Sequence, residues 1–170
     1  KPSSTFDLLA TMKPTTRFGE VFQYSNVMAS AAGYIGGHLY APKLEVGRAY
    51  DRAMRELVFT PLGMRETTFD FRTALRGNHA SPHGEDADGK MRISDMSANY
   101  TFVAYRPAGG VWTSSHDFAR YALLELSKGT LPGGKRLVSE TNLVARRLPQ
   151  VQIGEDHTYG MGLMVNKRWG

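Results

Sequence analysis

Between Asn26 and Tyr40, apolar side chains recur at intervals of three and four residues, the spacing of one face of an α-helix. Small residues fill much of the same stretch, including three glycines (Gly33, Gly36 and Gly37). Glycine weakens an isolated helix, so this helix must be stabilised by close packing on its neighbours. The same periodicity returns over residues 46–59 and stops near a Pro-Leu-Gly turn. The chain is therefore expected to contain a layer of packed helices.

The remaining segments predict shorter elements. Capping residues and stop signals indicate helices over residues 5–12, from Ser114 to Gly129 and from Ser139 to Leu148. β-Branched and aromatic residues predict a short strand over residues 66–71, and an apolar run predicts a buried strand over residues 159–165. Together with the long helices, these elements give a helix-rich α+β fold.

Two further expectations concern one helix face and one loop. The helix after Ser114 is expected to direct four side chains toward the core (Phe118, Tyr121, Ala122 and Leu126). Residues 77–89 are rich in turn formers and are expected to form a polar loop.

Composition excludes several classes of protein. The 170 residues include no cysteine, which excludes disulfides, thiolate metal sites and cysteine nucleophiles and leaves the cellular compartment open. No run of 18 apolar residues is present, so no membrane span is expected. The net charge of +5 could suit a nucleic acid, but the basic pairs are scattered and lack interleaved aromatic residues. A nucleic-acid partner is therefore not expected.

Two segments resemble cofactor-binding or metal-binding motifs, but neither predicts a bound group. Residues 129–135 match the spacing of a phosphate-binding loop, but Arg136 follows where a serine or threonine must reach magnesium. His79 and His83 lie near several carboxylates, yet Pro82 interrupts any helix that would put both imidazoles on one face. A plain turn and a solvated loop are the expected structures, with no metal and no organic cofactor.

The triplet Tyr24-Ser25-Asn26 lies where a loop meets the helix that begins near Asn26. A phenol and a carboxamide two residues apart can transfer a proton and orient a bound group. The residues alone leave a second interpretation open, in which Tyr24 packs as an ordinary aromatic side chain and Asn26 caps the helix.

Four segments resemble, in order, the middle of the serine β-lactamase and D,D-peptidase superfamily. They are Phe18-Gly19-Glu20-x-Phe22-x-Tyr24-Ser25-Asn26, Pro61-Leu62-Gly63-Met64-x-x-Thr67, Pro107-Ala108-Gly109-Gly110-Val111 with Ser114-x-x-Asp117, and Tyr159-Gly160-x-Gly162. The nearest branch is that of the class C β-lactamases, their esterase relatives and the D-aminopeptidase and D,D-carboxypeptidase group. The resemblance extends over nearly the whole chain and leaves esterase, lactamase and peptidase activities open.

The resemblance implies the β-lactamase and penicillin-binding-protein fold, in which helices pack with an antiparallel sheet, and an acyl-serine mechanism without a cofactor. Three elements run that mechanism: a Ser-x-x-Lys that holds the nucleophile, a Tyr-x-Asn, and a Lys-Thr-Gly or His-x-Gly strand. Only the second is present in the 170 residues. Residues 1–170 are therefore expected to be a single-domain internal fragment, incomplete at both ends and inactive by itself.

The resemblance also assigns roles within the triplet. Tyr24 becomes the proton-transfer residue, and Asn26 holds the lysine of the nucleophile motif and donates to the acyl-side carbonyl of the substrate. Ser25, between them, is expected to have a structural role, and the glycines of residues 107–110 are expected to form a tight turn rather than an oxyanion hole.

The expected function is thus part of a serine hydrolase that cleaves a small ester, amide or β-lactam. Its expected partners are that small-molecule substrate and the missing flanks of the same protein. The alternative is a non-catalytic binding or scaffold module that keeps the fold and has lost the nucleophile.

Overall fold

The computed structural model of the chain describes residues 1–166, and all of their side chains except that of Ala98. Helices dominate, and short antiparallel strands complete an α+β fold, as expected. In chain order the elements are α1 (Ser4–Thr11), α2 (Asn26–Tyr40), α3 (Val46–Met54), η1 (Arg55–Phe59), α4 (Thr60–Leu62), α5 (Phe71–Arg76), β1 (His83–Glu85), β2 (Met91–Ile93), η2 (Met96–Val103), η3 (Arg106–Ala108), α6 (Ser115–Leu126), α7 (Glu140–Ala145), β3 (Val151–Gln152), β4 (His157–Tyr159) and β5 (Met164–Asn166).

The expected close packing of α2 is confirmed by its contact with α3. A Cβ atom added to Gly37 would lie 2.5 Å from the Cα atom of Tyr50, so only glycine lets the two backbones approach this closely. Gly33 is similarly crowded, because its Cβ would lie 2.5 Å from Cβ of Pro107. Gly36 faces open space. Two of the three glycines therefore serve helix packing.

The main apolar cluster lies between the α3–α4 segment and α6. Its buried members are Phe59, Leu62, Met64 and Leu124, and partly buried apolar side chains surround them. The helical path that starts at Val46 runs through a π-helical turn as far as Leu62, beyond the predicted end at residue 59. Pro61 lies at the end of this path, after the π-helical turn, and Gly63 ends the path in a left-handed conformation with φ of 68°.

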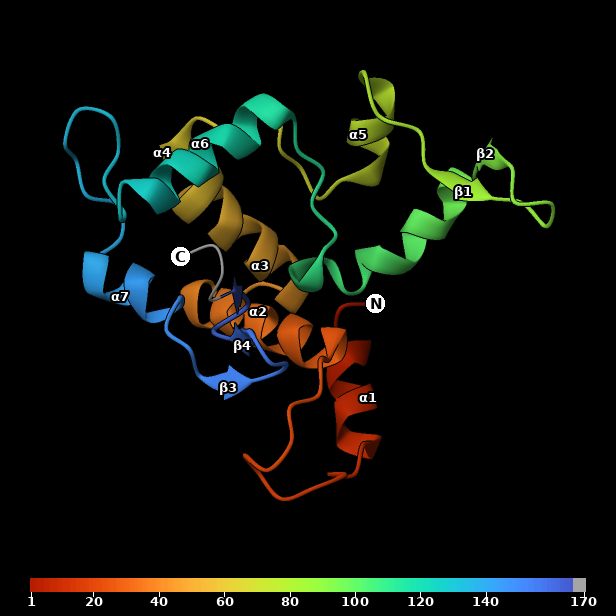
Figure 1. Cartoon of the computed structure of the whole chain (residues 1–170). Helices are drawn as coiled ribbons and strands as arrows, with labels where there is room; N and C mark the ends of the chain where they lie inside the picture. Colours follow the sequence, from red (N-terminus) through yellow and green to blue (C-terminus); the bar gives the residue numbers. More distant parts are fainter. Residues whose placement is uncertain (167–170) are drawn as a thin grey trace.

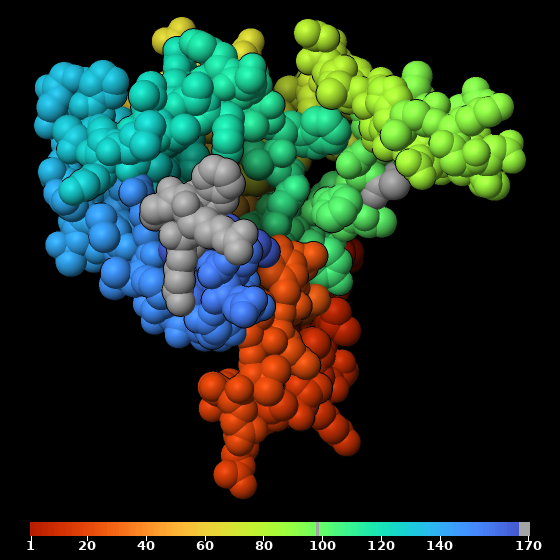
Figure 2. Space-filling model, in the orientation of Figure 1, coloured from red at the N-terminus to blue at the C-terminus, as the bar shows by residue number. Residues whose placement is uncertain are grey.

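Two small sheets accompany the helices. Strands β1 and β2 form an antiparallel hairpin in which His83 pairs with Ile93, and β3, β4 and β5 form a three-stranded antiparallel sheet in that order. Figure 1 shows the β1–β2 hairpin projecting away from the helices, and Figure 2 shows the same arm standing out from the surface. Residues 77–89, predicted to be loop throughout, therefore include strand β1.

Both predicted strands were wrong in detail. Residues 66–71 form no regular strand: Thr68 makes one isolated antiparallel bridge to Trp112, and α5 begins at Phe71 because Asp70 caps it. Residues 159–165 form parts of two strands, β4 and β5, with a turn between them at Gly162, whose φ is 74°. The apolar run by itself suggests one strand, but the glycine turn within it divides the run between two strands.

The inward face predicted for α6 is only partly correct. Tyr121 and Ala122 are half-buried, whereas Phe118 is 56% exposed and Leu126 is 78% exposed. The buried positions are Asp117 and Leu124, seven residues apart on one face of the helix. The C-terminal end of α7 also differs, because this helix ends at Ala145 rather than near residue 148. Among residues 1–166, no helix combines the length and the apolar character needed to cross a bilayer.

Candidate active site

The triplet of residues 24–26 lies at the N-terminal end of α2. Ser25 is the N-cap, since its Oγ accepts a hydrogen bond of 3.2 Å from the backbone N–H of Met28. The expected structural role of Ser25 is thereby confirmed. Asn26 is the first residue of the helix, so the alternative in which Asn26 itself caps the helix is wrong.

The backbone conformation at Ser25 leads us to expect that Tyr24 and Asn26 project toward the same side. Ser25 has extended dihedral angles (φ −141°, ψ 111°), and side chains two positions apart along an extended segment point the same way. Both residues are exposed, with 61% of Tyr24 accessible. Among the described residues, neither the Tyr24 hydroxyl nor the Asn26 carboxamide has a hydrogen-bond partner. Both polar groups are therefore free to contact a bound molecule.

An aromatic cluster fixes the ring of Tyr24 at this position. Tyr159 of β4 meets Tyr24 edge to face, with ring centroids 6.4 Å apart, and meets Phe22 at 4.8 Å. The first and last of the four motif segments, more than a hundred residues apart in the chain, thus meet in space. Next to Tyr159, a Cβ atom on Gly160 would overlap the backbone carbonyl of Arg146, so glycine is required there.

A second pair of motif segments meets at Asp117, whose carboxylate is buried. Its Oδ2 accepts hydrogen bonds from the Thr67 hydroxyl at 2.9 Å and from the Glu66 backbone N–H at 2.7 Å. The Asp117 backbone N–H in turn donates to Oγ of Ser114, which caps α6. The cap of α6 expected from the spacing of Ser114 and Asp117 is thus confirmed. The contacts of the carboxylate, which join the turn after α4 to the start of α6, were not predicted.

The same region offers the best candidate ligands for a metal ion within residues 1–166. Glu66, His116 and Asp117 place one ligand atom each within 4.8 Å of one another. The Asp117 carboxylate is already hydrogen-bonded on Oδ2, and the Arg120 guanidinium lies 3.8 Å from Oδ1. A cation would have to compete with that guanidinium, so we assign the group a structural role. His79 and His83 do not join it; each ring hydrogen-bonds a backbone carbonyl two residues earlier in the chain.

The third motif segment is anchored by Arg106, a buried residue that sequence reasoning missed. Its guanidinium forms a two-pronged ion pair with Asp51, with Nε–Oδ1 at 2.6 Å and Nη2–Oδ2 at 3.0 Å. Burial alone would lower the pKa of Arg106, but the hydrogen bonds and charge of Asp51 raise it above its ordinary value. The Tyr34 hydroxyl donates to the Ala104 carbonyl nearby at 2.6 Å. The ion pair therefore joins η3 to α3, and the Tyr34 hydrogen bond joins α2 to the segment that precedes η3.

The glycines after Pro107 form a tight turn, as expected. The backbone N–H groups of Gly109 and Gly110 both donate to the carbonyl of Arg106, at 3.3 and 3.0 Å. Because both donors are already used, they are unavailable to stabilise an oxyanion.

Comparison with known proteins gives one family match. A family model described as Beta-lactamase matches residues 2–170. Among curated proteins, the chain is 30% identical over 105 residues to penicillin-binding protein 4 of Amycolatopsis lactamdurans, a match that covers 59% of this chain and 26% of that protein.

Solved structures show the same fold at low sequence identity. The octameric penicillin-binding protein homologue from Pyrococcus abyssi superposes with a TM-score of 0.74 at 18% identity, over 96% of this chain and 35% of that one. The penicillin-binding protein from Bacillus halodurans gives a TM-score of 0.67 at 17% identity, over 98% of this chain and 47% of that one. The chain therefore spans less than half the length of each of these relatives.

Proposed function

We propose, from the premise that this chain belongs to the Beta-lactamase family, that Tyr24 and Asn26 are the proton-transfer and orienting residues of an acyl-serine hydrolase. The observation that supports the proposal is their placement: two exposed polar groups, free of partners among the described residues, lie two residues apart at the N-terminal end of α2. The substrate class is a small ester, amide or β-lactam.

The remaining catalytic elements are proposed to lie in a longer protein. Within the 170 residues no serine has lysine three positions later, and neither Lys-Thr-Gly nor His-x-Gly occurs. The chain spans 26 to 47% of its relatives' lengths, which leaves room for these elements elsewhere. The exposure of Tyr24 and Asn26 fits this division, because their side chains would face groups supplied from outside the chain.

In the proposed acylation step, the oxygen of the nucleophilic serine attacks the carbonyl carbon of the substrate. The serine proton passes to the phenol oxygen of Tyr24, with a neighbouring lysine ammonium favouring the phenolate. Collapse of the tetrahedral intermediate breaks the bond to the leaving group, which takes that proton. In deacylation, water loses its proton to Tyr24, attacks the acyl carbon and releases the acid, while the serine oxygen regains a proton.

Asn26 has a different role, because its carboxamide both accepts and donates hydrogen bonds. The carbonyl oxygen would accept from the lysine ammonium, and the NH2 group would donate to the acyl-side carbonyl of the substrate. Ser25 keeps this side chain in place by capping α2. Asn26 is therefore a positioning residue for the nucleophile's lysine and a contact for the substrate.

The proposal is tested by Tyr24→Phe in the longer protein that it requires. The change removes the hydroxyl and keeps the ring that packs on Tyr159. General acid–base assistance is worth about 100- to 10,000-fold, so kcat/KM on a chromogenic ester or cephalosporin should fall by that factor while Tm is unchanged. Tyr40→Phe is the matched control, since Tyr40 is an exposed tyrosine at the opposite end of α2. Equal activity of Tyr24→Phe and Tyr40→Phe would overturn the catalytic assignment.

A further inference from the structure

A cavity of about 760 Å³ lies away from the Tyr24–Asn26 pair, between the turn that follows α4 and the C-terminal half of α6. We propose that it binds a small amphipathic carboxylate, an anion with an aliphatic or aromatic body. Its volume falls within the range of small-molecule sites, roughly 300–1,000 Å³. Neither Tyr24 nor Asn26 lines it, so this proposal is independent of the proposed hydrolase function.

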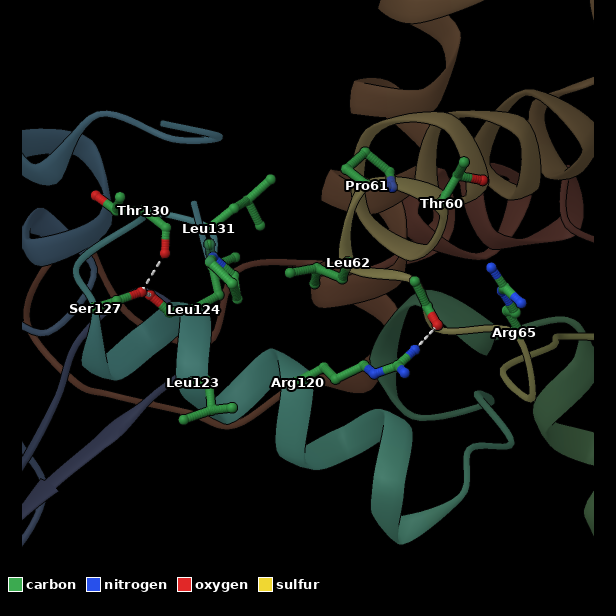
Figure 3. A pocket seen from close by; sticks show the side chains of 12 residues that line it. Thr60, Pro61, Leu62, Arg65, Arg120, Leu123, Leu124, Ser127, Thr130 and Leu131 are labelled. Carbon is green, nitrogen blue, oxygen red and sulfur yellow. Dashed lines mark hydrogen bonds between the residues drawn. The ribbon is translucent and has the colours of Figure 1, made fainter. Parts of the chain in front are cut away.

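The chemistry of the cavity differs between its two ends. Leu123, Leu124 and Leu131 form an apolar end, whereas Arg65 and the guanidinium of Arg120 lie on the other side of the cavity, as Figure 3 shows. Among the described residues that line the cavity, none is acidic. Asp117 lies near Arg120, so Arg65 supplies the uncompensated positive charge that would attract an anion, and the leucines would contact its apolar body.

The two arginines are available to different degrees. Arg120 donates from Nη1 to the Gly63 carbonyl and lies 3.8 Å from Asp117, which holds its guanidinium at the cavity wall. Five N–H donors on a guanidinium leave others for a ligand. Arg65 is exposed, and within residues 1–166 no ion pair or hydrogen bond engages its guanidinium. Arg65 is therefore the residue that can form a charge-assisted hydrogen bond with a bound carboxylate.

The apolar end also fits a ligand tail. Leu124 is buried in the main apolar cluster, and Leu131 packs against the same cluster, so this wall is part of the apolar core. Leu123, the residue before Leu124 in α6, also lines the cavity and is 56% exposed. A tail of several carbons would cover the Leu123 side chain and gain contact with the wall.

The test uses octanoate and the uncharged 1-octanol as probes of the 170-residue chain, with binding followed by calorimetry and by methyl NMR of the leucines. Octanoate should bind saturably, shift the Leu124 and Leu131 methyl signals, and bind about tenfold more tightly than 1-octanol. Arg65→Gln should weaken octanoate binding about fivefold, whereas Arg48→Gln, an exposed arginine of α3 that does not line the cavity, should not.

A second pair of variants tests the apolar end without disturbing the core. Leu123→Asp puts a negative charge at the rim and should abolish octanoate binding. Leu126→Asp makes the same change at another exposed leucine of the same helix, which does not line the cavity, and it should have no effect. The proposal is overturned if octanoate does not bind saturably, if 1-octanol binds as tightly, or if either variant matches its control. None of these measurements depends on hydrolysis.

Discussion

Arg106 illustrates what a single residue contributes to this fold. Its side chain is only 8% exposed, yet it carries a full charge, and Asp51 neutralises that charge across 55 positions of sequence. Arg106 also donates to the Val103 carbonyl, and its guanidinium lies 5.8 Å from the centre of the Tyr34 ring. Removing one partner of such a buried pair is strongly destabilising because the other charge stays buried.

The two tyrosines beside this ion pair make the fold sensitive to alkali. Burial raises the pKa of Tyr34 and of Tyr50 from 10.0 to about 12. The folded state therefore holds these phenol protons more tightly than the unfolded state. Stability should be constant below about pH 10 and fall by on the order of 1–2 kcal/mol per tyrosine as the pH rises to about 12.

Urea unfolding between about pH 8 and 12, with phenolate absorbance recorded in parallel, measures this effect. Tyr34→Phe should be less stable at neutral pH, because the hydrogen bond to the Ala104 carbonyl is lost. It should also lose less stability between about pH 10 and 12 than the wild type. A wild-type stability that stays level to about pH 12 would contradict the assignment.

At the residue level, the sequence identified groups whose role depends on near neighbours and missed those whose partners are distant. Ser25 was assigned a structural role, and its hydrogen bond spans three residues. Arg106 received no such role, and Asp117 was singled out only as part of the cap of α6, because the partners of their side chains lie 55 and about 50 positions away and no local pattern indicates them. Tyr24 and Asn26 were singled out through the family resemblance, and their catalytic roles stay a prediction.

At the scale of elements, the approach of α2 to α3 depends on one glycine. Gly37→Ala would put a methyl group 2.5 Å from the Tyr50 backbone, which side-chain rotation cannot relieve. The helices must separate, and the free energy of unfolding should fall by about 1–3 kcal/mol or more.

Gly36→Ala is the matched control for this change. Gly36 is the preceding residue of the same helix, is exposed and faces open space. Alanine there should raise stability by about 0.5–1 kcal/mol, because it favours the helix without a clash. Chemical denaturation of the two variants gives both values, and a similar effect of the two substitutions would show that α2 and α3 do not pack as described.

Helices were predicted better than strands for a physical reason. The ends of α6 lie close to its cap Ser114 and to Gly129, and α2 is long enough to show its apolar period over several turns, so their positions could be predicted. The strands have two or three residues each, too few for a periodic pattern to stand out, and their pairing depends on contacts across turns. A short apolar run such as residues 159–165 therefore gave the wrong number of strands.

At the scale of the whole molecule, the four motif segments converge on three places. The first and last meet at Tyr159, the second meets Asp117 at the start of α6, and the third contacts α2 through Pro107 and Gly33. Only the first place presents free polar side chains of the proposed catalytic types. The order of the segments could be read from the sequence, whereas their convergence required the fold.

Under the proposed function, the 170-residue chain should lack an activated serine. A fluorophosphonate or a β-lactam should therefore leave its intact mass unchanged, while the longer protein is labelled once. The longer protein contains the same serines as the chain, so labelling of the longer protein alone would place the reactive serine outside the chain. Stoichiometric labelling of a serine within the chain would contradict the division of catalytic elements that we propose.

The outer face of α2 is apolar and exposed. Met28, Ala32, Ile35, Gly36 and Leu39 follow one another at helical spacing, and all are exposed. The opposite face is buried through Ala31, Tyr34 and Gly37. A helix that is apolar on both faces is typical of one enclosed on both sides. Under the proposed function, the rest of the longer protein would cover this outer stripe.

The isolated chain should therefore bind an apolar dye and self-associate through the outer stripe of α2. Ile35→Lys combined with Leu39→Lys should reduce anilinonaphthalene-sulfonate fluorescence about twofold and lower the sedimentation coefficient at high protein concentration. Stability should change little, because both positions are exposed. Val21→Lys combined with Leu57→Lys is the control, since it replaces two exposed apolar residues outside the stripe with the same charge. An equal loss of fluorescence in both double variants would show that dye binding and association reflect general surface polarity, and the stripe would then give no indication of a covering structure.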